Sequence, residues 1–177
     1  MQHVRYNVVM TKLLFLTIIL LAAFVCDCSN ARSVDQSAGS KAFAPPANDL
    51  TEADVVKLKW LEGTWKGMDD DKPFYERYRF EGTSMVVESL KDEKLEIEDA
   101  DRFELVNGEF GKGEGEDRSA VSQITESSVQ FVPAIKGTGN SFRFERQDEN
   151  TWNAILEWEA NDKSPAGRKV YVMQRVK

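Results

Sequence analysis

Glu76 is the acidic residue of this sequence whose position offers the clearest chemistry. It shares the alternating parity of Tyr78 and Phe80, so on a strand the three side chains lie on one face. If that face is the protein interior, the carboxyl group must be paired, protonated or in contact with water, because a lone buried charge is costly. Arg146 shares the parity of the aromatic residues on its own predicted strand. It is therefore the candidate partner of Glu76 or of a ligand carboxylate.

Residue types exclude most catalytic and metal-binding schemes. The chain has one histidine, His3, and two cysteines, Cys26 and Cys28, which all precede residue 29. Beyond them no serine-histidine-aspartate triad, thiol nucleophile, or histidine or cysteine zinc site can be built. We therefore expect no metal, no cofactor and no enzymatic activity. An acid/base enzyme based on Glu76 is the least favoured alternative.

Three further segments match ligand-binding motifs only superficially. Residues 111–115, Gly-Lys-Gly-Glu-Gly, lack the Gly-Lys-Ser/Thr ending of a phosphate-binding loop. Their glycines at every second position instead predict a strand bend or close backbone packing. The acidic stretches at 69–71 and 92–104 lack the twelve-residue calcium-loop pattern and predict solvated turns and strand faces.

The charge balance argues against nucleic acid as a partner. The sequence has 30 acidic residues against 23 basic residues, which gives a formal net charge of -7. Binding through a phosphate backbone needs clustered lysine and arginine. We expect no nucleic-acid partner.

An export leader is predicted at the N-terminus. Lys12 precedes an apolar run over residues 13–25, which as a helix rises about 20 Å and falls short of the roughly 30 Å hydrocarbon core of a bilayer. Met10 lies at a normal distance from Lys12, so it is an alternative start to Met1. Small residues just before Arg32 predict cleavage there. We interpret residues 1–31 as a signal peptide and expect a periplasmic or secreted protein.

A membrane-anchored lipoprotein is the alternative to soluble export. Acylation would fall on Cys26 or Cys28, although neither has the small residue that usually precedes a lipidated cysteine. An uncleaved anchor is the third alternative. We expect contact with a membrane only through such an N-terminal anchor.

The composition changes twice after the leader. Residues 32–49 contain Phe43 as their single large apolar side chain and predict a disordered tether. The folded domain then spans residues 50–177. Thr51 and Asp54 are placed to cap a short helix over residues 52–61.

After Gly63 the apolar period changes from that of a helix to that of a strand. Alternation of the kind seen at Phe142 and Phe144 is typical of half-buried strands. The best hairpin signal is Asn107-Gly108, because both residues tolerate positive φ. Turn residues at intervals of about ten predict roughly nine antiparallel strands. The fold class is therefore mainly β, an up-and-down barrel that closes to avoid open edges, with one short N-terminal helix.

Residues 58–65, Leu-Lys-Trp-Leu-Glu-Gly-Thr-Trp, resemble the opening of lipocalin- or calycin-like barrels, whose Gly-x-Trp signature is Gly63-Thr64-Trp65 here. They are similar to uncharacterised exported bacterial domains that open with Leu-x-Trp-Leu-x-Gly-x-Trp and are related in shape to nitrobindin. The resemblance continues through residues 75–78, 101–105 and 131–146. It implies a calycin-like β-barrel that binds a small, mostly apolar molecule in its mouth.

The resemblance also implies structural roles for Gly63, Trp65 and Arg175. In lipocalins the signature tryptophan packs at the closed end of the barrel beneath a basic side chain of the last strand. Arg175 is placed for this role and Arg168 is the second choice, while a solvated Arg175 at the strand edge is the alternative. Haem binding of the nitrobindin kind needs a proximal histidine, and none follows His3, so we discard it.

Together these observations predict a monomeric, exported, non-catalytic protein that holds a small hydrophobic or amphiphilic ligand inside a β-barrel. The alternative is a barrel filled by its own side chains that acts as an envelope-associated interaction module. The predicted ligand-binding residues are Trp65, Glu76, Tyr78, Phe80, Phe131, Phe142, Phe144, Arg146 and Trp158.

Overall fold

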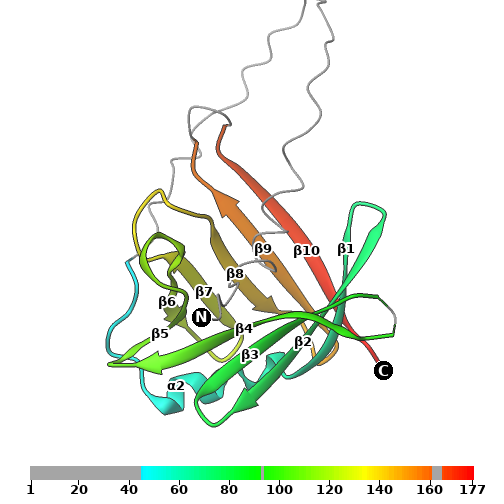
Figure 1. Cartoon of the computed structure of the whole chain (residues 1–177), viewed down its shortest axis with the longest axis horizontal. Helices are drawn as coiled ribbons and strands as arrows, with labels where there is room; N and C mark the ends of the chain where they lie inside the picture. Colours follow the sequence, from blue (N-terminus) through cyan, green and yellow to red (C-terminus); the bar gives the residue numbers. More distant parts are fainter. Residues whose placement is uncertain (1–44, 93, 161–164) are drawn as a thin grey trace, which may run out of the picture. The chain divides into compact units, whose positions relative to one another are not determined.

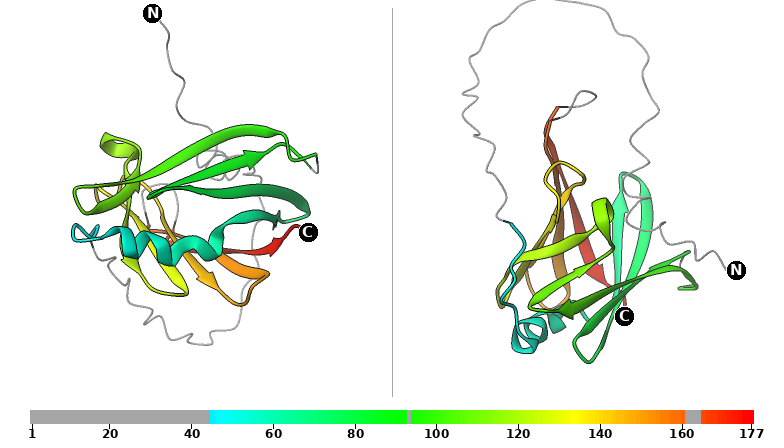
Figure 2. Two further views of the ribbon diagram at one scale, coloured as in Figure 1. Left: turned by 90° about the horizontal axis from the view of Figure 1, so that it is seen from below. Right: turned by 60° about the vertical axis from the view of Figure 1, so that its left-hand side comes forward.

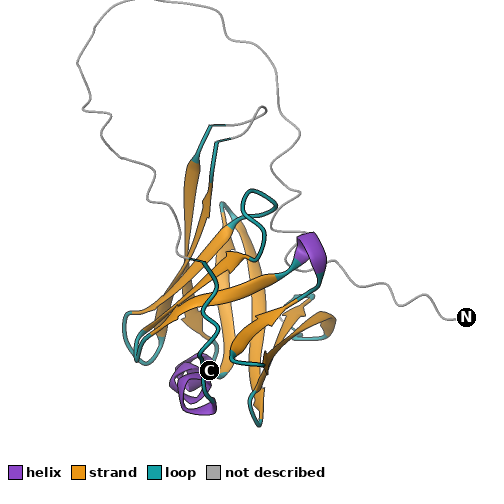
Figure 3. Cartoon of the chain, turned by 90° about the vertical axis from the view of Figure 1, so that its left-hand side faces the viewer, coloured by secondary structure: helices purple, strands orange, loops and turns teal. Residues whose placement is uncertain are grey.

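A computed structural model describes residues 45–92, 94–160 and 165–177. The predicted signal peptide, including the cysteines on which lipidation depends, lies outside the described residues. So does most of the predicted tether. The described part consists mainly of strands (Figure 3).

The predicted helix forms in two halves. The first, α2, is an α-helix over Glu52–Val56, and the second, η1, is a 3-10 helix over Lys57–Leu61. The predicted cap is present: the backbone N–H of Thr51 donates to Asp54 Oδ2 at 2.9 Å. This cap fixes the start of the helix, because it satisfies a backbone donor that has no partner within the helix.

Ten antiparallel strands in the described residues form a closed barrel, which confirms the predicted fold class (Figure 1). The strands are β1 (Gly63–Asp69), β2 (Lys72–Glu81), β3 (Ser84–Leu90), β4 (Ile97–Val106), β5 (Glu109–Lys112), β6 (Ser119–Ile124), β7 (Ser128–Pro133), β8 (Ser141–Arg146), β9 (Thr151–Trp158) and β10 (Gly167–Arg175). Each strand pairs with its neighbours in sequence, and β10 pairs with β1 to close the barrel. This architecture is compatible with a lipocalin- or calycin-like fold.

The additional strand arises at the glycine-rich segment. The predicted strand bend is wrong there, because β5 ends at Lys112 and a short 3-10 helix, η2, follows over Gly115–Asp117. Gly113 and Gly115 adopt φ values of +76° and +57°, which glycine tolerates better than other residues and which break the strand. The predicted close backbone packing does occur at Gly111, where a Cβ would lie 2.5 Å from the carbonyl oxygen of Ser119.

The hairpin predicted at Asn107 and Gly108 joins β4 to β5. Both residues have positive φ, 52° and 81°, as a type I′ turn requires. The segment that precedes the helix packs against this region: the N–H of Leu50 donates to the carbonyl of Gly108, and the N–H of Ala47 to that of Val121, both at 2.8 Å. Backbone contacts with the barrel therefore begin a few residues before the predicted domain start.

The α2–η1 segment lies across one end of the barrel, as the view from below shows (Figure 2). Leu58 and Leu61 are fully buried there. The indole N–H of Trp65 donates to the carbonyl oxygen of Leu61 at 2.7 Å. The helical segment thus closes this end of the barrel around the tryptophan of the Gly-x-Trp signature.

Candidate functional site

The inner face of the barrel is identified by strand register together with ring contacts. Residues directly opposite one another in a sheet share a face. Trp65 pairs with Glu76 between β1 and β2, and Tyr78 follows Glu76 on the same face of β2. The ring of Tyr78 meets those of Phe144 on β8 and Trp152 on β9, at centroid distances of 6.3 and 5.7 Å. These strands are distant in the barrel order, so the rings meet in the interior.

Aromatic side chains from most of the barrel form a continuous cluster inside it. Trp152 contacts Trp65 at 5.9 Å and Phe144 at 4.7 Å between ring centroids. The chain of contacts continues from Phe144 to Phe131 at 5.5 Å and from Phe131 to Phe103 at 5.2 Å. Such edge and tilted contacts favour a well-ordered apolar wall.

A polar cluster lies against this aromatic wall. The hydroxyl of Tyr78 donates to Glu76 Oε2 at 2.7 Å. Lys112 on β5 forms an ion pair with Asp101 on β4, and its ammonium lies 5.7 Å from the ring centroid of Phe103. Residue Asp101 is on the inner face, because its register partner Val87 is itself opposite Tyr78. We call Glu76, Tyr78, Asp101 and Lys112 the inner polar cluster.

Burial dominates the electrostatics of Glu76. Desolvation raises the pKa of its carboxyl group, and the nearby carboxylate of Asp101 raises it further, while the hydrogen bond from Tyr78 and the charge of Lys112 act in the opposite direction. Desolvation and the charge of Glu76 also hold the pKa of Tyr78 well above its usual value. Tyr78 therefore stays protonated at neutral pH and donates to the carboxylate.

Ser119 adds an unfilled hydrogen-bonding group to the same inner face. It is directly opposite Lys112 between β5 and β6. Ser119 is only 9% exposed, and its Oγ has no hydrogen-bond partner. Because buried hydroxyl groups in folded proteins normally have partners, this group marks a place where a polar ligand atom or water would be accommodated.

Several inward-facing side chains nevertheless keep contact with solvent. Phe144, Ala154 and Glu76 are all partly exposed, although each faces the interior. Phe144 and Ala154 are directly opposite one another between β8 and β9. A barrel filled completely by its own side chains would bury such residues. The described barrel therefore has accessible apolar surface at Phe144 and Ala154, and the ring of Phe144 meets that of Tyr78, the hydrogen-bond partner of Glu76.

A second group of polar and aromatic side chains lies on the inner face, toward the β1–β2 turn. Lys169 on β10 forms an ion pair with Asp69 on β1, and this contact raises the pKa of the lysine. Its ammonium also lies 5.1 Å from the ring centroid of Tyr171, which packs edge-on against Phe74 at 5.5 Å. These contacts join β1 to β10 beyond Trp65 and Lys66, the residues of β1 that pair directly with β10.

The predicted site residues fall into three groups. Trp65, Tyr78, Phe131 and Phe142 are buried, and Glu76, Phe80, Phe144 and Trp158 are partly exposed. Arg146 is separate from both groups. It is exposed, and its Nε donates to the carbonyl oxygen of Asp148 at 3.3 Å.

The suggested pairing of Arg146 with Glu76 is wrong, because the hydrogen-bond partner of Glu76 is Tyr78 and the cation whose charge lowers its pKa is Lys112. Parity placed Arg146 on the inner face, but its position at the end of β8 lets the long side chain reach solvent. Sequence reasoning also missed Asp101, Lys112 and Ser119. Asp101 has the same parity as Phe103, which could have indicated that it faces inward. Lys112 lies between two glycines, so no neighbouring side chain indicates its face.

The three residues with predicted structural roles, Gly63, Trp65 and Arg175, lie together in the structure. The guanidinium carbon of Arg175 lies 4.0 Å from the ring centroid of Trp65. Its Nη1 donates to the carbonyl oxygen of Glu62 at 2.8 Å. Gly63 has φ of +128°, and a Cβ at this position would lie 2.3 Å from Nη1 of Arg175. The glycine of the signature therefore leaves the space in which the arginine sits.

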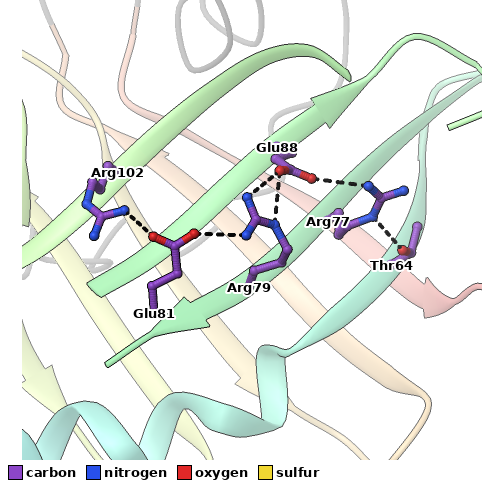
Figure 4. A network of polar contacts seen from close by, with 6 residues as sticks. All are labelled: Thr64, Arg77, Arg79, Glu81, Glu88 and Arg102. Atoms are coloured by element: carbon purple, nitrogen blue, oxygen red, sulfur yellow. Dashed lines mark hydrogen bonds and ion pairs between the residues drawn. The ribbon is translucent and has the colours of Figure 1, made fainter. Parts of the chain in front are cut away.

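A separate charged network covers the outer face of β2, β3 and β4 (Figure 4). Glu88, which is only 3% exposed, accepts hydrogen bonds from Arg77 at 3.3 Å and from Arg79 at 2.7 and 3.0 Å. Arg79 also contacts Glu81, which in turn pairs with Arg102. Each of these charges has a partner of opposite sign, which favours a structural role for this network.

Comparisons with protein-family models, with curated proteins and with solved structures found no match to this chain. Within the residues that the structure describes, no group of three or more histidine, cysteine, aspartate or glutamate side chains is arranged to hold a metal ion. The described helices are too short or too polar to span a membrane.

Proposed function

We propose that this protein is an exported, non-catalytic binding protein that holds a small amphiphilic molecule inside its barrel. The observation that carries the proposal is the partly exposed inner surface at Phe144 and Ala154. This surface is linked to Glu76 through Tyr78, whose ring meets that of Phe144 and whose hydroxyl donates to Glu76. An apolar wall with a few polar groups is the usual composition of a small-molecule site. The apolar wall would receive the ligand body and the inner polar cluster its polar end.

The closed end of the barrel supports a relationship to lipocalin- or calycin-like proteins. The Gly-x-Trp signature, the short helix before it and the stacked Arg175 occur together here. Barrels of this size are able to hold one small ligand. Export rests on the predicted signal peptide at residues 1–31, and the absence of histidine and cysteine after Cys28 supports a role without catalysis.

The alternative, a filled barrel that interacts through its surface, receives less support. It requires that the inward side chains bury one another, whereas Phe144 and Ala154 remain partly exposed. The charged outer network around Glu88 is internally paired and offers few free groups to a partner.

The proposal is tested by titrating the full-length protein with 1-decanol below its solubility limit and following tryptophan fluorescence. Trp152 contacts Phe144, so a ligand beside this wall should change the emission. We expect saturable binding of one molecule per chain. Ala154→Leu, which adds volume on the inner face, should weaken binding at least tenfold.

Asn153→Leu is the matched control, because it adds the same side chain on the adjacent, outward position of β9. Its affinity should stay within twofold of wild type. Absence of saturable binding to the wild-type protein by decanol, decylamine and decanoate alike would overturn the proposed function. So would equal effects of the two leucine variants.

A further inference from the structure

The charges around Glu76 do not balance. The charged groups that act on its carboxyl group are Lys112 and Asp101, and these two already form an ion pair with each other. The cluster thus contains two carboxyl groups and one ammonium. Tyr78 supplies a hydrogen bond to Glu76 but no charge. When Glu76 ionises, one negative charge on the inner face lacks a cationic partner.

The strands next to Glu76 do not supply the missing cation. Its register partners are Trp65 on β1 and Ser89 on β3. Ser89 is in turn opposite Asp99 on β4, a further acid. Lys169, a further lysine on the inner face, forms its ion pair with Asp69. Within the described barrel, the residues directly opposite Glu76 on the two adjacent strands therefore supply no cation.

An independent observation indicates that this inner face receives a polar ligand group. The buried hydroxyl of Ser119, opposite Lys112, has no hydrogen-bond partner. A purely apolar ligand would leave this hydroxyl unpaired and would also leave the charge of Glu76 without a cationic partner, and both are unfavourable inside a protein. A ligand with a polar end relieves part of this cost.

We propose that the ligand is an amphiphilic amine whose ammonium group pairs with the carboxylate of Glu76, while its apolar body lies along Phe144 and Ala154. This inference rests on the proposed function and specifies the chemical class of the ligand. One added positive charge balances the two carboxylates and one lysine of the cluster. A fatty acid would instead bring a third carboxylate to a lysine that Asp101 already occupies.

The inference is tested with three probes of equal chain length, namely decylamine, 1-decanol and decanoate, each below its micellar concentration at pH 7.5. Binding to the full-length protein is measured by tryptophan fluorescence and by calorimetry. We expect decylamine to bind at least tenfold more tightly than decanol, and decanoate to bind more weakly than decanol. The comparison uses the wild-type protein and does not depend on the folding of a variant.

Glu76→Gln provides the second arm of the test. Glutamine retains the length of the side chain and an acceptor for Tyr78, but it removes the charge. We expect the preference for decylamine over decanol to disappear in this variant, so that the two probes bind it with similar affinity. Glu104→Gln is the matched control, because it removes an acid that is 56% exposed on the outward face of β4 and should leave decylamine binding unchanged.

The outcomes separate the two proposals. Decanol binding without a preference for decylamine, or tighter binding of decanoate, overturns the amine assignment and leaves the proposed function standing. An equal loss in Glu76→Gln and Glu104→Gln also overturns it, because the preference would then reflect net charge alone. Failure of all three probes to bind overturns both.

Discussion

Arg175 is stacked on Trp65, with its guanidinium carbon 4.0 Å from the ring centroid, and the same side chain joins three parts of the chain. Its Nη1 donates to the carbonyl oxygen of Glu62, which follows the helical segment, and its Nε donates to that of Glu149, in the turn between β8 and β9. One residue near the C-terminus thus connects the closing segment, the first strand and the neighbouring hairpin.

We expect Arg175→Ala to lower the free energy of unfolding by about 2–3 kcal/mol, since it removes a cation–π contact and charged hydrogen bonds to backbone carbonyls. Arg175→Lys should recover only part of the loss, because an ammonium group lacks the planar fork that reaches several acceptors. Urea unfolding of the full-length proteins measures both changes. Wild-type stability in Arg175→Ala would show that the stacked geometry contributes nothing.

Gly63→Ala should destabilise the barrel by about 2–4 kcal/mol, because a Cβ displaces the arginine and φ of +128° strains any other residue. A double-mutant cycle with Arg175→Ala separates these causes. Once the arginine is absent, the cost of Gly63→Ala should fall by at least about 1 kcal/mol. Simple additivity would argue against contact between the two positions. Gly82→Ala, at φ +62° with open space around it, reports backbone strain without a clash.

The network around Glu88 should respond asymmetrically to mutation. Replacement of Arg77 and Arg79 by methionine leaves a nearly buried carboxylate without a cation, and we expect a loss of about 3–4 kcal/mol. Glu88→Gln leaves two arginines that are 30% and 44% exposed and therefore remain hydrated, so its cost should be about 1–2 kcal/mol. Chemical denaturation of the variants tests the order, and the reverse order would contradict this account.

The raised pKa of Glu76 predicts a pH dependence of stability. The folded state holds the proton more tightly than the unfolded state, so the contribution of this group falls as pH rises from about 4.5, its ordinary value, through the folded pKa. Glu76→Gln should therefore gain stability relative to wild type as pH increases over this window. Unfolding curves at pH 4 to 8 measure the difference. A difference that is constant, or that falls with pH, would be incompatible with a desolvated Glu76.

The affinity for an amine should rise with pH as Glu76 loses its proton, whereas the contribution of Glu76 to stability falls. An ammonium group pairs with ionised Glu76, and Asp101, Lys112 and Tyr78 are the titratable groups around it. We expect decylamine affinity to weaken as pH falls through the raised pKa of Glu76, with decanol affinity nearly constant. The titrations described above, repeated at pH 5 and 7.5, make this comparison. Parallel changes for both probes would indicate a general effect of pH on the barrel.

Local chemistry accounts for what the sequence predicted correctly. Asn107 and Gly108 form a hairpin because their backbones accept positive φ, and Thr51 begins the helix because it caps it. The strands were also predictable from local sequence, because side chains along a strand point alternately to its two faces. The strand boundary at residues 113–118 was missed because the glycines fit a bend as well as a turn.

By itself the sequence determined a mainly β barrel and a capped helix, whereas it left open whether Arg175, Arg168 or neither lies over Trp65. The tertiary structure decided that Glu76, Asp101 and Lys112 share one cluster and that Arg146 lies outside it. These placements depend on which residues of β2, β4 and β5 come to the same level of the barrel. Register between strands arises from packing across the whole barrel, and parity within one strand does not contain it.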